Sequence, residues 1–374
     1  MNDKELGKLT AEAVALLREM VAVPSCSFEE NDVRQLLASR LAERGLNCGA
    51  TGNNIVCRSR EWSGSMKTLM LCAHMDTVPA AATYTFDAFN PDGKQAAARI
   101  SELRNESLAP EQIVAGLGSN DDGASVVALS AVFQYFEGRK LPFNLLLAIS
   151  CEEERSGPGG MRHLWGNVVN PDWAIVGEPT CMRAATSERG LLVLDGTAYG
   201  VAGHAARGEG VNALYIALED MMKLRNHRFT RISPRMGEVK MTVTQVNAGT
   251  AHNVIPDRCD FVVDIRPTEM YTNSEILEEL QAMCSSELKA RNLLNCSSAT
   301  FEGSPLAATL ETMGIETFSS PTTSDWMRLR CDAIKMGPGD SSRSHKADEY
   351  VLVDEIEKAI KQYVEFIENF SKAI

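Results

Sequence analysis

The stretch Leu69-Met70-Leu71-Cys72-Ala73-His74-Met75-Asp76 decides the fold of this chain. It is a short apolar run that ends in an imidazole and a carboxylate, and such runs are typical of strands that helices cover on both faces. Residues 144–151 lead in the same way into Glu152-Glu153-Glu154, and residues 173–177 lead into Glu178. Because ligands of open α/β sheets bind beyond the carboxyl ends of the strands, we expect these side chains to meet at one rim.

A rim of this kind would gather several acids. Carboxylates brought together without a counter-charge repel one another and are costly to desolvate. The simplest way to hold them together is a pair of divalent metal ions. Taken singly, each feature has an ordinary explanation: helix-capping acids at Asp121-Asp122, a solvated loop for the glutamate run, and a surface residue for His345. Their joint placement at strand and helix ends favours the metal site.

The composition is that of an ordinary soluble globular protein, with 374 residues, 44% of them hydrophobic and 23% charged, enough for two or three domains. The net charge of −13 argues against nucleic acid and anionic membranes as partners. No apolar run approaches the roughly 20 residues of a membrane helix, and the first residues lack the apolar core of a secretory signal. Ten cysteines are scattered without a C-x-x-C pair, and Cys72 and Cys151 fall in expected core strands. We therefore expect a cytoplasmic protein.

Helices and strands alternate up to Glu178, which is the pattern of a doubly wound sheet. After Cys181 the expected strands are 191–199, 240–247 and 260–265, and the expected helices are 210–224 and 274–289. These elements predict a small α+β layer, after which the α/β rhythm resumes. We therefore predict an α/β fold with a doubly wound mixed sheet in two parts, 1–183 and 294–374, split by an inserted α+β domain at 184–293. Residues 80–115, polar and aperiodic, are expected to run irregularly over the surface.

Eight short segments carry motifs that occur together and in a fixed order. They are Ala73-His74-Met75-Asp76-Thr77-Val78-Pro79, Gly118-Ser119-Asn120-Asp121-Asp122, Cys151-Glu152-Glu153-Glu154, Val176-Gly177-Glu178-Pro179-Thr180, Gly203-His204-Ala205, Asn253-Val254-Ile255-Pro256, Asp264-Ile265-Arg266 and His345-Lys346-Ala347-Asp348-Glu349-Tyr350. Over essentially its whole length, the chain thereby resembles the two-zinc aminoacyl hydrolases that include acetylornithine deacetylase, succinyl-diaminopimelate desuccinylase and related carboxypeptidases. The resemblance is greatest to the acetylornithine-deacetylase-like branch. It implies a catalytic domain and an inserted dimerisation, or lid, domain.

The resemblance also implies two Zn²⁺ ions per subunit, for which Co²⁺ or Mn²⁺ can substitute. The implied ligands are His74 and Glu178 for one ion, Glu154 and His345 for the other, and Asp121 as the bridge. Glu153 would be the general base and Asp76 would orient His74, and the Asp121–Asp122 peptide bond would be cis. Glu153 and Glu154 can take different roles only if the chain bends after the strand, and the alternative register, Glu152 and Glu153, stays open.

Three positions depart from the family pattern without removing a ligand. Asp122-Gly123-Ala124 stands where the family usually has x-Lys-Gly after the bridging aspartate. Leu117 replaces a common arginine, and Glu152 replaces an aspartate. We therefore expect the activity to be retained and the surroundings of the ligands to differ.

The resemblance implies a metal-dependent deacylase that removes an acetyl or succinyl group from ornithine or citrulline, as in arginine biosynthesis. The free α-carboxylate of such a substrate suits a bidentate arginine, and Arg266 with Asn253 is the candidate. Arg266 could instead tie two strands of the insert together. The rival functions are a dipeptidase or carboxypeptidase with the same metals, and an inactive metal-binding homologue.

The inserted domain is expected to make the protein a homodimer. The resemblance places His204 in a loop that could reach the metals of the other subunit. There it would donate to the carbonyl oxygen as negative charge develops. The alternative is a loop histidine that caps local backbone groups.

Overall fold

The computed structural model describes residues 1–91 and 94–374, and the chain separates into two compact units. Unit 1 consists of Met1–Thr186, Thr300–Phe318 and Ser324–Ile374. Unit 2 consists of Ser187–Ala299 and Ser319–Thr323. In sequence, unit 2 is therefore an insertion into unit 1.

Unit 1 is built on a nine-stranded mixed sheet in the order β1-β2-β5-β3-β6-β16-β7-β14, with β15 paired to β7. The strands are β1 Cys48–Thr51, β2 Asn54–Arg58, β3 Thr68–His74, β5 Asn144–Ser150, β6 Trp173–Val176, β7 Ala184–Glu188, β14 Ser298–Ala299, β15 Thr317–Ser320 and β16 Asp332–Lys335. The central strands β3, β5, β6 and β16 pair in parallel, whereas β1, β2 and β7 join antiparallel. This confirms the predicted α/β fold with a mixed sheet.

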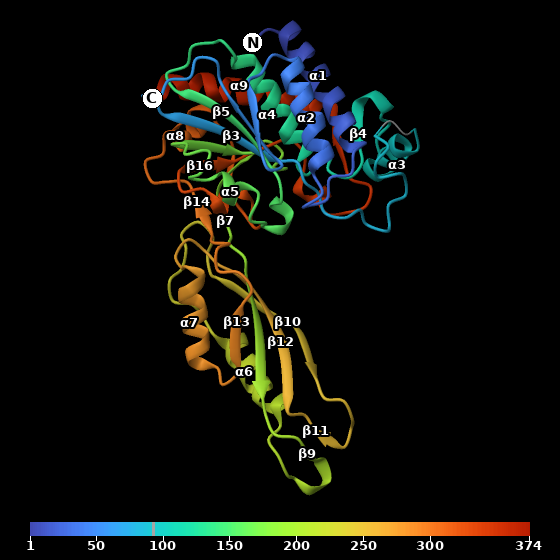
Figure 1. The fold of residues 1–374 in the computed structure, drawn as a ribbon, viewed down its shortest axis with the longest axis vertical. Helices are drawn as coiled ribbons and strands as arrows, with labels where there is room; N and C mark the ends of the chain where they lie inside the picture. The colour runs from blue at the N-terminus through green and yellow to red at the C-terminus, as the bar shows by residue number, and fades with distance from the viewer. Residues whose placement is uncertain (92–93) are drawn as a thin grey trace. The chain divides into compact units, whose positions relative to one another are not determined.

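Helices cover both faces of this sheet. They are α1 Asp3–Val21, α2 Asn31–Glu43, α4 Gly123–Phe136, α5 Met161–Leu164, α8 Pro305–Met313 and α9 Val353–Ala373. The helix α3 Lys94–Arg104 packs instead in a separate apolar cluster with Phe86 and Ile113. Figure 1 shows α1, α2, α4 and α9 gathered over one face, where Leu69 and Leu71 of β3 join the largest buried apolar cluster. Met70 and Cys72 point to the other face, which Met161 of α5 covers. Among the described residues, no helix combines the length and the apolarity that a membrane crossing requires.

The carboxyl ends of the central strands lie at the same level. His74 at the end of β3 is opposite Ser150 at the end of β5, and Cys72 is opposite Val176 at the end of β6. The chain therefore leaves β5 and β6 on either side of His74. The glutamate run and Glu178 follow directly, which is the arrangement that the apolar runs predict.

The segment after β3 is more regular than predicted. Within residues 80–115, of which 92–93 lie outside the described residues, the chain forms α3 and the strand β4 Ile113–Ala115. β4 pairs with β17 Tyr350–Leu352, and a small apolar cluster that includes Phe86 and Ile100 packs this region. The prediction of an irregular segment was wrong. The helix α3 buries only Ala96, Ala97 and Ile100, and so few buried residues give no clear helical period in the sequence.

Unit 2 is a four-stranded antiparallel sheet in the order β10-β12-β8-β13, with two helices packed against one face (Figure 1). Its elements are β8 Leu192–Tyr199, α6 Ala213–Asn226, β10 Lys240–Ala248, β12 Arg258–Arg266, α7 Asn273–Met283 and β13 Glu287–Ala290, and a separate pair joins β9 Gly203–His204 to β11 Val254–Ile255. The helix expected over 274–289 was wrong in its last third. There α7 ends at Met283 and the chain turns into β13, a short strand that the sequence analysis did not find.

Two cysteines are joined in a way that the sequence spacing did not indicate. Cys48 and Cys57 lie opposite each other in the β1–β2 hairpin and form a disulfide. The other eight cysteines are free, and Cys72 and Cys151 are buried as expected. The bonded pair depends on the register of the hairpin, which the cysteine spacing alone does not give.

Candidate active site

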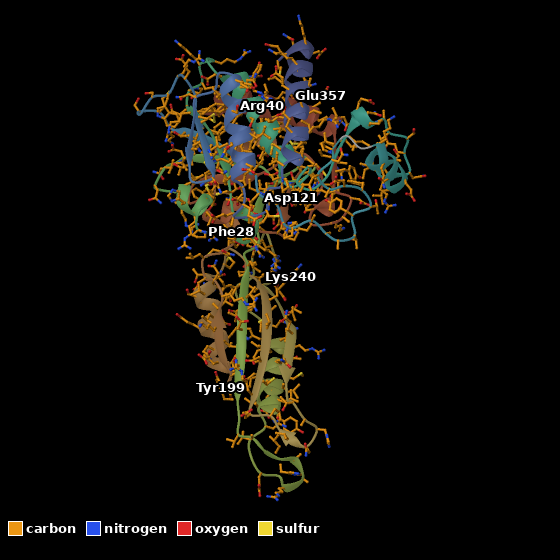
Figure 2. The ribbon with its side chains drawn as sticks, turned by 45° about the vertical axis from the view of Figure 1, so that its right-hand side comes forward. Phe28, Arg40, Asp121, Tyr199, Lys240 and Glu357 are labelled. Atoms are coloured by element: carbon orange, nitrogen blue, oxygen red, sulfur yellow. A yellow bond between two sulfur atoms is a disulfide. The ribbon has the colours of Figure 1, made fainter. Side chains whose placement is uncertain are left out.

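Asp121 lies between two imidazoles in unit 1. Its Oδ1 is 3.3 Å from Nε2 of His74, and its Oδ2 is 3.8 Å from Nε2 of His345. His345 in turn lies 2.9 Å from a carboxylate oxygen of Glu154. Figure 2 labels Asp121 within unit 1, just before α4, and the peptide bond between Asp121 and Asp122 is cis, as expected. One carboxylate thus offers a separate oxygen to each histidine.

Asp76 contacts both the imidazole of His74 and the glutamate turn. Nδ1 of His74 is 2.9 Å from the backbone oxygen of Asp76 and 3.5 Å from its Oδ1. The carboxylate of Asp76 accepts the backbone N–H groups of Glu153 and Glu154 at 3.0 and 3.1 Å, and the hydroxyl of Ser27 at 2.7 Å. The residue expected to orient His74 therefore also holds the next two candidates in place.

The glutamate run bends directly after β5. Glu152 has a left-handed backbone, with φ 57°, and the 3-10 turn η2 Glu153–Arg155 follows. The Glu152 carboxylate accepts the backbone N–H of Gly159 at 2.7 Å. A Cβ atom at Gly157 or Gly159 would lie only 2.2 or 2.4 Å from its carboxylate oxygens, so the two glycines leave room for this side chain. The Glu152 carboxylate is thus already bonded within this glycine cradle, formed by Gly157 and Gly159. This favours the register in which Glu153 is the general base and Glu154 is the metal ligand.

Burial shapes the charge state of the cluster. Burial raises the pKa of Glu153 well above its ordinary value, and the neighbouring acids add to the rise. Burial, with the charge of Asp121, likewise raises the pKa of Glu178. Burial alone would lower the pKa of His74, but its hydrogen bonds to Asp121 and Asp76 outweigh that effect and raise it well above the ordinary value. Without a cation, the site therefore favours protonated groups.

Glu349 is a supporting residue that the sequence analysis did not single out. Its carboxylate, 2% exposed, accepts three backbone N–H groups, from Gly118 at 3.1 Å and from Asn120 and Asp121 at 2.9 Å. It thus holds the loop that presents Asp121. Its place four residues after His345, inside a matching motif, was the signal that could have pointed to it.

Two further buried carboxylates brace the glutamate turn. Glu30 accepts the backbone N–H groups of Phe28 at 2.7 Å and Glu152 at 3.1 Å. Asp325, the first residue of the 3-10 turn η4 Asp325–Arg328, accepts the hydroxyl of Ser150 at 2.5 Å. Neither follows a strand of the rim in sequence, so no pattern in the chain marks them.

The remaining candidates lie in unit 2, at two different places. His204 in β9 is exposed, and its Nδ1 accepts the N–H of Ala206 at 3.2 Å. Asn253 lies beside it, because its backbone oxygen accepts the N–H of Ala205 at 3.0 Å. Arg266 is the last residue of β12, and its guanidinium bonds Asp264 at 2.8 and 3.0 Å. The structure therefore brings His204 and Asn253 together. They follow Tyr199 and precede Arg258, at the start of β12, whereas Arg266 lies at the end of β12.

The geometry around Asp121 fits divalent metal ions. His74, Asp121 and Glu154 each offer one ligand atom, and these atoms all lie within 4.8 Å of one another. Imidazole nitrogen and carboxylate oxygen are donors that Zn²⁺ accepts, and Co²⁺ and Mn²⁺ accept them as well. Burial, together with the charge of Asp121, raises the pKa of Glu178, and a cation would favour its ionised form. The cluster is therefore a possible metal site.

Comparisons with known proteins agree with this geometry. The family described as a peptidase dimerisation domain (M20_dimer) matches residues 186–292. An acetylornithine deacetylase of Edwardsiella ictaluri is 26% identical over 395 residues, covering 96% of this chain and 97% of that protein. A succinyl-diaminopimelate desuccinylase of Ehrlichia chaffeensis is 23% identical over 393 residues, covering 97% and 99%. An M20 family metallo-carboxypeptidase from Sulfolobus solfataricus has the same fold, with a TM-score of 0.71 at 15% identity over 100% of both chains.

The mixed sheet, the acid and histidine rim and the antiparallel insert define a metallohydrolase. Residues 186–292 match the M20 peptidase dimerisation domain, and acetylornithine deacetylases and succinyl-diaminopimelate desuccinylases are among the homologues of the chain, at 26% and 23% identity. These relatives and the solved structure of the same fold are named as acylamino acid deacylases and as a metallo-carboxypeptidase.

Proposed function

We propose that the protein hydrolyses the N-acyl bond of a small acylated amino acid, an acetyl or succinyl derivative of ornithine or citrulline, in arginine biosynthesis. The observation that carries hydrolysis is the position of Asp121 between His74 and His345. Relatives named as deacetylases and desuccinylases, matched over almost their full length, support a deacylase over a peptidase.

The proposed ligands are His74 and Glu178 for one ion, Glu154 and His345 for the second, and Asp121 for both. When bound, the two ions would polarise the scissile carbonyl and make a water acidic enough to lose its proton near neutral pH. Glu153 would take that proton, since its buried carboxyl has a raised pKa and so binds a proton readily. It would then pass the proton to the leaving amine, which departs neutral as the acyl group becomes a free carboxylic acid.

Arg266 is the proposed partner of the substrate α-carboxylate. Its side chain is 35% exposed and bonds Asp264 on its own strand, and among the described residues it bonds no side chain of a neighbouring strand. This supports a guanidinium that a substrate can reach, and it argues against the alternative in which Arg266 ties two strands together. A carboxylate can be bound bidentately by such a group.

The placement of His204, Asn253 and Arg266 supports a site shared by two subunits. β12 has nine residues and spans roughly 27 Å at about 3.4 Å per residue, so the ends of unit 2 are far apart. Figure 2 marks the two ends by Tyr199, which pairs with Arg258, and Lys240, which pairs with Arg266. Arg266 and the His204–Asn253 pair therefore belong to one site only if different subunits supply them.

Unit 2 offers a surface on which a second copy could pair. Tyr215, Leu218 and Met222 of α6 are 64%, 45% and 49% exposed, although all three are large and apolar. They recur at helical spacing, so they lie along one side of α6. β10 is an edge strand of the same sheet, with unpaired backbone groups on its outer side. An apolar helix side and an open edge strand support the homodimer that the dimerisation domain suggests.

The substrate proposal is tested with purified, metal-loaded protein on a panel of substrates. The panel contains acetyl- and succinyl-ornithine, acetyl- and succinyl-citrulline, and dipeptides of similar size. We expect the largest kcat/KM for an acylated ornithine or citrulline. A clear preference for dipeptides would replace the deacylase with a dipeptidase, and no turnover of any substrate would favour an inactive metal-binding homologue.

The cytoplasm is the proposed compartment. Eight of the ten cysteines are free, and four of these are buried, which suits a reducing environment. The disulfide between Cys48 and Cys57 is the feature that runs against this proposal. Thiol titration of protein isolated under alkylating conditions would decide, because ten reduced cysteines are expected if the compartment is reducing.

A further inference from the structure

We propose that unit 2 carries a binding site for a small organic phosphate, separate from the metal site. The site is a hollow of about 520 Å³ between the end of α6, the segment that follows it and the start of β10. Lys240, labelled in Figure 2, marks the first residue of β10. A hollow of this volume is within the range of small-molecule sites in proteins.

The charge of the hollow is opposite to that of the whole chain. Arg189, Arg225, Arg228 and Lys240 line it, and Glu238 is the acid among its lining residues. The chain as a whole has a net charge of −13. Four cations around one hollow would concentrate small anions there, against the field of the rest of the protein.

The exposed cations of the hollow lack carboxylate partners. In the described contacts, Arg225 and Lys240 form no ion pair, and Arg228 donates only to the backbone oxygens of Arg225 at 3.2 Å and His227 at 2.8 Å. Three arginines elsewhere in unit 2 behave differently. Arg231, Arg258 and Arg291 bond Glu275, Asp260 and Asp195 at 2.8, 2.7 and 2.7 Å. The cations of the hollow are thus left available for a ligand.

Arg189 adds a buried positive charge to the same hollow. Its side chain belongs to a residue that is 7% exposed, and its guanidinium donates to the backbone oxygens of Met236, Glu238 and Arg266. Within the described residues it forms no ion pair. Glu269 is the acid whose charge acts on the pKa of Arg189, and its carboxylate accepts the hydroxyl of Ser233 at 2.6 Å. A buried cation without an anion is costly, so an anion in the hollow would be stabilised.

The lining also indicates what kind of anion fits. A single carboxylate needs one guanidinium, whereas four cations match the two charges and three oxygens of a phosphate monoester. Leu224, Phe229 and Met236 line the same hollow and give an apolar surface for an organic group. We therefore assign an organic phosphate and not a simple carboxylate.

The test is calorimetric titration of the metal-loaded protein with phenyl phosphate and, separately, with benzoate, at constant ionic strength. The variant Arg225→Gln/Arg228→Gln removes two cations of the hollow, and Arg231→Gln/Arg291→Gln is its matched control outside it. We expect saturable binding of phenyl phosphate by the native protein and the control, and about tenfold or more weaker binding by the first variant.

Three results would overturn the proposal. They are no saturable binding of phenyl phosphate, equal affinity in the native protein and the Arg225→Gln/Arg228→Gln variant, and benzoate binding as tight as that of phenyl phosphate. The second result would also place the phosphate elsewhere, for example at the metals. Because the readout is binding, the outcome does not depend on whether the proposed deacylase activity is correct.

Discussion

Glu349 holds Asp121 by its backbone, with a carboxylate oxygen 2.9 Å from the Asp121 nitrogen. The same carboxylate binds two more N–H groups of that loop. In the variant Glu349→Gln, an amide NH₂ would face backbone donors, so the loop should shift. We expect metal affinity to fall about 10–100-fold, as is typical when a partner of a ligand is changed. Metal titration and the visible spectrum of the cobalt-loaded protein measure this effect directly.

A neighbouring variant serves as the control for Glu349. Asp348 is also buried, but it bonds Thr85 at 2.8 and 3.0 Å and Arg99 at 2.9 Å, not the Asp121 loop. Asp348→Asn should leave the cobalt spectrum unchanged. If both variants lost metal to the same degree, Glu349 would have only a general role in stability.

Glu153 is predicted to act on protons and not on metal. In Glu153→Ala, metal content should persist while kcat falls about 10²–10⁴-fold, the usual contribution of a general base. Metal analysis and steady-state kinetics on the same sample measure both quantities. Glu152→Gln, which changes the adjacent acid in its glycine cradle, should keep most of the activity. The reverse pattern would shift the register of the glutamate run by one residue.

Subunit mixing tests the shared site. His204→Ala and Glu153→Ala homodimers should each be inactive, because each lacks a residue in every site. After subunit exchange, a mixed dimer would have one site with both residues intact, so activity should return to part of the native level. No recovery, despite exchange confirmed by mass spectrometry, would place His204 in its own subunit or outside catalysis.

The metal-free protein should lose stability as the pH rises. Burial raises the pKa of Asp122 and of Glu349 to about 8, and the hydrogen bond to Glu154 raises that of His345 to about 9. The folded state therefore binds more protons than the unfolded state, in which these groups titrate near about 4 and 6.5. The stabilisation that these three groups contribute is fully present below their unfolded values and is lost as the pH rises to about 9.

Calorimetry at several pH values checks this prediction. The lowered pKa values of Asp76 and Asp121 act in the opposite direction, but only below about pH 4, outside the window from pH 5 to 9. The metal-loaded protein is the control, since bound cations favour the ionised carboxylates. A Tm of the metal-free protein that is constant or rises from pH 6 to 9 would contradict the prediction.

Gly123 lies too close to neighbouring atoms to carry a side chain. A Cβ atom there would lie 2.4 Å from the backbone oxygen of Gly118 and 2.7 Å from Cδ1 of Leu17. Gly123→Ala should therefore destabilise the protein by about 1–3 kcal/mol in urea unfolding, as overpacking does. Gly7→Ala in α1 is the matched control: a Cβ there meets nothing within 4 Å, so a gain of roughly 0.5–1 kcal/mol is expected. Equal effects of the two changes would refute the close approach at Gly123.

Much of unit 1 was predictable because its central strands are buried on both faces. That burial makes the run up to His74 continuously apolar, and the functional residues follow at the strand ends. By contrast, β13 has only Leu288 fully buried, so its sequence resembles the end of a helix. A strand with one buried residue gives no alternation of apolar and polar residues from which the strand could be predicted.

The supporting carboxylates could not be predicted for a different reason. Glu30, Asp325 and Glu349 each receive hydrogen bonds from groups far along the chain, such as Glu152 for Glu30 and Ser150 for Asp325. A carboxylate bonded in this way looks like any surface acid in the sequence. The residues of the cluster itself could be recognised from their motifs. The supporting carboxylates could not, because their contacts exist only once the backbone has folded.

The position of unit 2 in the sequence also sets an order of events during synthesis. His74, Asp121, the glutamate turn and Glu178 all precede Ser187–Ala299, whereas His345 follows it. A growing chain therefore exposes the whole of unit 2 while the rim still lacks one imidazole. Since domains generally fold as units during translation, two nascent chains could meet through unit 2 before either rim is complete. Assembly would then come first and full metal coordination second.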